Sequence, residues 1–137
     1  MSDKKRVEKT VWVPVEGLGF DIKVRYLPRN ELTRMLERAT ETTWDRKAGQ
    51  NIDRVKPKKL LREYAGVILD WRGLTRDIFA QLIPIEPSEY PEEIPCTEEY
   101  KLELLEEAYG FDAVVRQICT DLAHFQDQQQ EEEAKNS

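Results

Sequence analysis

The residues whose side chains could carry out chemistry are few and far apart along the chain. His124 is the single histidine, and the two cysteines, Cys96 and Cys119, belong to no Cys-x-x-Cys pair. Cys119 and His124 lie five residues apart on a predicted helix, which corresponds to about 500° of rotation, so their side chains point in different directions. We therefore predict two reduced thiols, no nucleophile–base pair and no metal site.

Acidic residues are abundant, but they occur in runs, which is typical of a solvated surface. The runs are Glu92-Glu93, Glu98-Glu99, Glu106-Glu107 and residues 131–133. A catalytic carboxylate pair needs a pocket that raises the pKa of one member, and the sequence marks no such pocket. The sequence also contains no phosphate-binding loop, dinucleotide fingerprint or calcium loop. We therefore predict that the protein is not an enzyme and uses no cofactor.

Charge is distributed unevenly over the 137 residues. Residues 1–69 contain 16 Lys and Arg against 10 Asp and Glu, a net charge of +6, whereas residues 70–137 contain 5 against 17, a net charge of −12. One interpretation is chance combined with a solvated acidic tail. The other is a bipolar molecule whose copies attract one another head to tail, as a ring or a helix.

The same composition bears on location and partners. The basic half is diluted by acids and carries no phosphate-binding or base-stacking motif, so we expect no nucleic-acid partner. No apolar run approaches the ~18 residues that span a bilayer, and no apolar stretch follows the basic start, so we expect neither a membrane segment nor a secretory signal. These features predict a cytoplasmic protein.

Hydrophobic spacing predicts a small single domain that is mainly α, with about four helices after an N-terminal β-hairpin. Alternating apolar residues place the hairpin at 10–27, with Gly17 and Gly19 in its turn. Helices are predicted at about 30–42, 58–71, 97–109 and 112–125. The predicted domain covers residues 10–125, between a flexible N-terminus (1–9) and a disordered acidic tail (126–137). The expected core contains Leu36, Tyr64, Ile68, Trp71, Leu105, Ile118, Leu122 and Phe125.

Two tryptophans are candidate partner-binding residues. The segment 42–59 is polar, contains Gly49 and Pro57 and shows no hydrophobic period, so it is predicted to be a mobile loop. Trp44 lies in this loop, and an exposed tryptophan is a candidate binding hot spot, although it could instead pack back onto the domain. Trp12, on the predicted hairpin, is the second candidate.

The stretch from Lys59 to Phe125 carries a family resemblance. It contains a helix that ends in Asp-Trp-Arg-Gly-Leu at 70–74, an Ile-Pro connector before a threonine N-cap, the run Glu-Glu-Tyr-Lys-Leu-Glu-Leu-Leu and a last amphipathic helix. The matching positions are Trp71, Gly73, Leu74, Pro95, Thr97, Leu105, Ile118 and Phe125. This arrangement resembles the tail assembly chaperones of long-tailed bacteriophages.

The resemblance implies a role in tail assembly. Such proteins bind the long, helical tape measure protein while the tail is built and are absent from the finished virion. A longer, frameshifted form recruits tail tube subunits. The end of this chain, Ala134-Lys135-Asn136, can be encoded by GCA-AAA-AAC, which contains a slippery heptamer. The competing interpretation is a small acidic adaptor or inhibitor that binds a host or phage protein.

Overall fold

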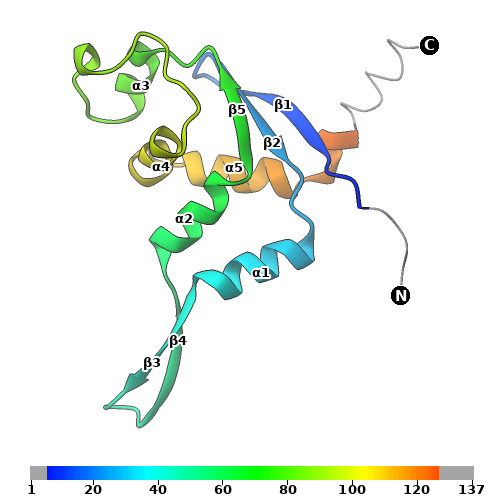
Figure 1. The fold of residues 1–137 in the computed structure, drawn as a ribbon, viewed down its shortest axis with the longest axis vertical. Coiled ribbons are helices and arrows are strands. Elements are labelled where there is room, and N and C mark those ends of the chain that lie inside the picture. Colours follow the sequence, from blue (N-terminus) through cyan, green and yellow to red (C-terminus); the bar gives the residue numbers. More distant parts are fainter. Residues whose placement is uncertain (1–5, 127–137) are drawn as a thin grey trace.

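The computed structural model describes residues 6–126, which form a mixed α/β fold (Figure 1). The prediction of a mainly α fold was therefore wrong, although the predicted N-terminal hairpin is present. The elements, in chain order, are β1 (Thr10–Val15), β2 (Phe20–Arg25), α1 (Arg29–Ala39), β3 (Thr40–Asp45), β4 (Gln50–Val55), α2 (Pro57–Ala65), β5 (Ile68–Arg72), α3 (Arg76–Leu82), the short 3-10 helix η1 (Pro87–Glu89), α4 (Glu98–Glu107) and α5 (Phe111–Thr120).

The core lies between a three-stranded antiparallel sheet and the helices on one of its faces. The strand order is β1-β2-β5, so the central strand is β2. Its alternate residues Phe20, Ile22 and Val24 are buried, because period two turns them all toward the same face. Helix α5 crosses this face of the sheet, and α2 and α4 pack beside α5 (Figure 1).

Strand β5 corrects the predicted helix 58–71. Helix α2 ends at Ala65, and the chain then turns at Gly66 and pairs with β2. A β-bulge explains why the sequence indicated a helix here. Ile68 pairs with Val24 and Trp71 pairs with Ile22. Three residue steps along β5 therefore lie opposite two residue steps along β2. The two buried residues are consequently three apart, which is the spacing expected of a helix.

A second, two-stranded sheet replaces the predicted mobile loop at 42–59. Strands β3 and β4 pair along their full length, from Thr40 opposite Val55 to Asp45 opposite Gln50. They project from the ends of α1 and α2 (Figure 1), and we call residues 40–55 the arm. The arm is rich in β-branched residues, but neither of its faces packs into the core. The apolar alternation that identifies a half-buried strand is therefore missing from its sequence.

Six of the eight expected core residues are buried, and two are not. Leu36 and Leu122 are each 38% exposed. On α1 the buried positions are Met35 and Ala39, so Leu36 faces outward. Helix α5 ends at Thr120, so Leu122 no longer follows the helical period that buries Val115 and Ile118. The flexible N-terminus and acidic tail predicted at the chain ends lie mostly outside the described residues.

A buried hydrogen bond ties β5 to the proline-rich connector before α4. The Trp71 indole Nε1 donates to the carbonyl oxygen of Ile94 at 2.7 Å. Trp71→Phe keeps a large apolar ring but leaves this buried carbonyl without its donor. We expect a loss of about 1–3 kcal/mol in the free energy of unfolding, measured by urea denaturation. Trp44→Phe, an exposed site with no such bond, is the control, and an equal effect at both sites would contradict this role.

Candidate interaction surface

The arm has a defined conformation from its base to its tip. At the tip, the Asp45 carboxylate Oδ1 accepts hydrogen bonds from the backbone N–H groups of Lys47 (2.8 Å) and Ala48 (3.3 Å). Gly49 adopts φ +66°, a conformation that a side chain would strain, and its N–H donates to the Asp45 carbonyl at 2.8 Å. The turn therefore holds the two strands in one register and fixes the position of Arg46 and Lys47.

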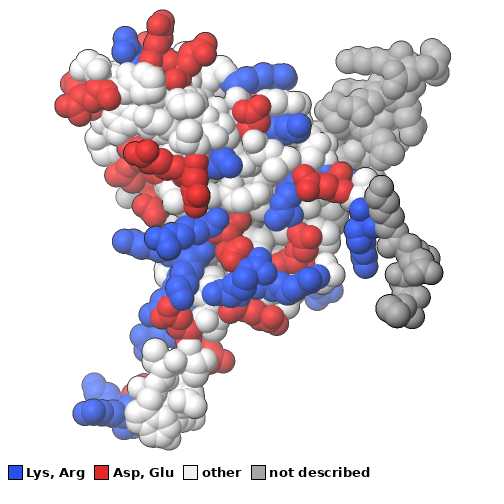
Figure 2. Space-filling model, in the orientation of Figure 1, with Lys and Arg blue, Asp and Glu red and all other residues white. Residues whose placement is uncertain are grey.

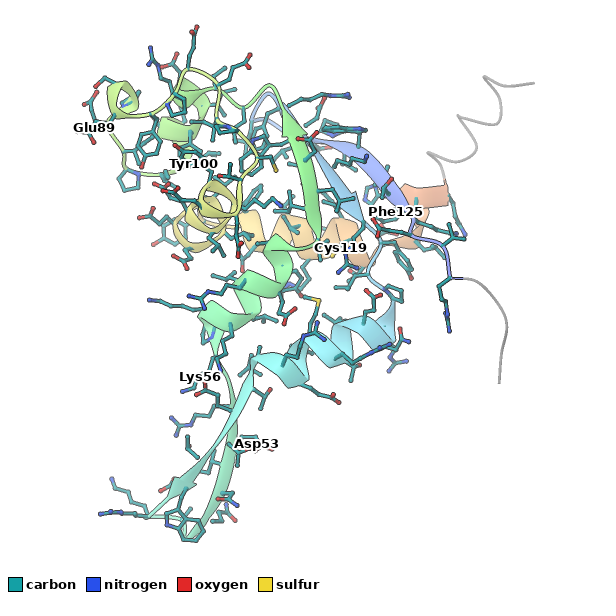
Figure 3. All side chains as sticks on the ribbon, in the orientation of Figure 1. Asp53, Lys56, Glu89, Tyr100, Cys119 and Phe125 are labelled. Carbon is teal, nitrogen blue, oxygen red and sulfur yellow. The ribbon has the colours of Figure 1, made fainter. Side chains whose placement is uncertain are left out.

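The base of the arm is anchored to both flanking helices. The backbone N–H of Lys56 donates to the carbonyl of Ala39 at 2.7 Å. The Glu41 carboxylate pairs with the ammonium of Lys59 on α2 and lies 3.7 Å from that of Lys56. The hydrogen bond from Lys59 lowers the pKa of Glu41 below its usual value. The anchoring orients the arm away from the body, with Asp53 on the arm and Lys56 at its base (Figure 3).

One face of the arm continues onto α1 as a partly apolar surface. Trp44 is 62% exposed, Val55 46% and Leu36 38%. Val55 and Leu36 line a shallow groove of about 520 Å³, together with Thr33, Glu37, Thr40, Thr42 and Asp53. Trp44 follows Thr40 and Thr42 at the spacing of two that places side chains on the same face of a strand. We call this groove, with Trp44 at its outer end, the arm face.

The arm face combines apolar contact area with a small polar rim. The Thr42 hydroxyl donates a hydrogen bond to Asp53 Oδ1 at 2.5 Å. The carboxylate of Glu37 also lines the groove. Large exposed apolar side chains grouped on one surface are typical of protein-binding sites. Sequence reasoning missed Leu36 and Val55, because it assigned Leu36 to the core and Val55 to a loop. The β-branched residues of 40–43 were the available signal for a strand.

The two predicted partner-binding residues lie in different parts of the molecule. Trp44 is on the arm, whereas Trp12 is on β1, in the sheet at the other side of the body (Figure 1). The guanidinium of Arg72 lies 4.3 Å above the Trp12 ring, and Arg72 Nε donates to Asp21 Oδ2 at 2.9 Å. Trp12 is therefore half-buried beneath a paired cation, and the two tryptophans do not form one site.

In the described part of the chain, the histidine and the two cysteines have different surroundings. His124 Nε2 lies 3.7 Å from Asp121 Oδ2 on the same stretch of chain. Burial raises the pKa of both the Cys96 and the Cys119 thiol to about 11, so each stays protonated near neutral pH. Within residues 6–126 no group of three or more potential metal ligands is found. The strongest candidate site in this part of the chain is thus the arm face.

The other distinctive surface is acidic. Residues 76–110 contain ten Asp and Glu against two Lys and Arg, and this segment forms α3, η1 and α4. Figure 2 shows red side chains clustered over this end of the molecule, with blue side chains nearer the base of the arm. Within the acidic end the Tyr90 hydroxyl donates to a Glu103 carboxylate oxygen, and this bond raises the pKa of Tyr90 to about 12.

Fold and surface together define a small α/β domain with a protruding, partly apolar arm. In the described part of the chain, no helix is long and apolar enough to cross a membrane. The family model of the YdaY prophage protein matches residues 28–136, from the start of α1 onward, and the chain therefore belongs to this prophage protein family. No curated protein and no solved structure matches the chain. The matched region includes the arm and Trp44 but not β1 with Trp12.

Proposed function

We propose that this protein is a tail assembly chaperone, which binds the tape measure protein and helps recruit tail tube subunits during tail assembly. The observation that carries the proposal is the arm face, where Leu36, Val55 and Trp44 remain exposed on an anchored hairpin. Membership of a prophage family and the resemblance of residues 59–125 to tail assembly chaperones support it. A long helical client with an exposed apolar stripe would find a matching groove between α1 and the arm.

The proposal includes two further partners. Copies of the chaperone associate head to tail along the client, through oppositely charged surfaces. A frameshift-extended form brings in the tail tube protein. The Ala134-Lys135-Asn136 codons, which lie outside the described residues, identify the frameshift site if they read as a slippery run followed by an open −1 frame. A gene without that run and frame would remove the extended form from the proposal.

Replacing two groove residues tests the proposal at its site. In Leu36→Ser/Val55→Ser, the apolar contact area of the groove is lost while the core is untouched, so co-purification with the tape measure protein of the same prophage should fall about tenfold or more. The measurement is affinity capture of the co-expressed tagged client, with the recovered chaperone quantified.

The matched control is Leu69→Ser/Leu122→Ser, because Leu69 and Leu122 have the same exposure as Leu36 but lie elsewhere. The control should co-purify like the wild type. Equal losses in the two double variants, or no loss in the groove variant, would contradict the placement of the client on the arm face. Trp12→Ala and Trp44→Ala, made singly, then show which tryptophan contributes to the client complex.

A further inference from the structure

The tip of the arm presents an aromatic ring beside two cations. Trp44 is 62% exposed, and Arg46 and Lys47 follow it in the turn, where both are exposed. A two-stranded hairpin gains little stability from its own pairing, and beyond its base this one extends away from the body (Figure 1). Its tip is therefore available to another molecule and is directed away from the rest of its own chain.

A small apolar pocket lies at the corner where α4 meets α5. It has a volume of about 160 Å³, and its walls include Val15, Leu18, Leu82, Phe111 and Val114. An apolar cavity of about 150 Å³ is large enough to admit benzene, so this pocket can receive a six-membered ring such as the outer ring of an indole. Tyr109 stands fully exposed at its edge. Trp44 of the same copy does not line this pocket.

Two acidic residues directly precede the pocket wall in the chain. Glu106 and Glu107, at the end of α4, are both exposed and immediately precede Ala108 and Tyr109 of the pocket wall. They belong to the acidic segment 76–110, whose net charge is −8, whereas residues 29–65, which include the arm, contain ten basic and six acidic residues and carry +4. The two surfaces are complementary: the arm tip carries an exposed aromatic ring and two cations, and the α4–α5 corner carries an apolar pocket and two carboxylates.

We propose that the arm of one copy docks onto the α4–α5 corner of a second copy of this chain. Trp44 enters the pocket, and Arg46 and Lys47 pair with Glu106 and Glu107 of the neighbour. Because the two surfaces are different, each copy keeps one free arm and one free pocket, and association continues as a ring or an open helix. This contact would join the copies head to tail. Their alignment along a client rests on the proposed function, but the contact itself needs no client.

Purified full-length chain tests the contact without any phage partner. Sedimentation velocity at low salt should show concentration-dependent association that weakens at high salt, because salt screens exposed charges. Trp44→Ala should weaken association about tenfold or more, as expected for a central aromatic residue of an interface. The charge reversals Arg46→Glu/Lys47→Glu and Glu106→Lys/Glu107→Lys should each leave the chain monomeric.

Mixing the two reversal variants gives the decisive result. An equal mixture should associate again, because each reversed arm meets a reversed corner and each native arm meets a native corner. Glu98→Lys/Glu99→Lys, the same charge change at the other end of α4, is the control and should associate like the wild type. A wild-type monomer at high concentration and low salt, no effect of Trp44→Ala, or no rescue on mixing would overturn the proposal. Client binding is measured separately with Leu36→Ser/Val55→Ser, because those two residues take no part in the contact between copies, whereas Trp44 cannot lie in a neighbour's pocket and on the client at the same time.

Discussion

The Ile118→Asp variant should fail to fold at 37 °C. Ile118 lies on α5 with 6% of its surface exposed, in the layer that packs against the sheet. The substitution removes the burial of a large apolar side chain, worth roughly 1.5–3 kcal/mol, and adds the cost of placing a carboxyl group among apolar neighbours without a partner. Because domains of this size are stable by only about 5–15 kcal/mol, the sum removes most or all of the stability.

Circular dichroism and a thermal melt provide the measurement for Ile118→Asp. The neighbouring Gln117→Asp introduces the same side chain at an exposed position of the same helix, so it controls for helix propensity and charge. It should change the melting temperature little. A cooperative melt of Ile118→Asp near the wild-type temperature would show that α5 does not form part of the core.

Shortening the arm should abolish self-association and weaken client binding while leaving the body folded. The design joins Glu41 directly to Arg54 through an Asn-Gly turn, since these two residues are paired opposite each other and Asn-Gly favours a two-residue hairpin. It keeps the pairing of Glu41 with Lys59 and the hydrogen bond from Lys56 to Ala39. It removes Trp44, Arg46 and Lys47 together.

Two measurements separate the expected effects of the shortened arm. The melting temperature should stay close to that of the wild type, because the arm packs mainly on itself beyond its base. Association of the purified chain should fall to background. Recovery of the chain with the tape measure protein should fall without being lost, because Thr42, Trp44 and Asp53 of the arm face are removed while Leu36 and Val55 remain. A shortened chain that binds the client as well as the wild type would place the client site outside the removed residues, whereas a chain that unfolds would show that the arm stabilises the body.

The sequence predicted best the parts of the fold that contact the core. The alternation around Phe20, Ile22 and Val24 identified the first hairpin, and Thr97 marks the start of α4, where its hydroxyl accepts from the Tyr100 N–H at 3.4 Å. Period-based reasoning succeeds at such places because burial on one side imposes the period.

Where burial and local period disagree, sequence reasoning failed. The bulge in β5 gave a strand the spacing of a helix between Ile68 and Trp71. The arm has no buried face, so its strands left no apolar alternation and were predicted as a loop. Leu36 was assigned to the core because it continues the helical spacing of the apolar residues on α1, but α1 buries Met35 and Ala39 and turns Leu36 outward. The candidate site was therefore only partly predictable, through Trp44.

The solubility of the tape measure protein with and without this chain tests the proposed chaperone function. The tape measure gene of the same prophage is expressed alone, with the wild-type chain, and with the Leu36→Ser/Val55→Ser variant. We expect the client alone to be largely insoluble, as a protein with exposed apolar stripes would be. The wild-type chain should keep it soluble and elute with it, whereas the variant should do so poorly. Equal client solubility in all three cultures, with no co-elution, would contradict the account and favour an adaptor or inhibitor with another partner.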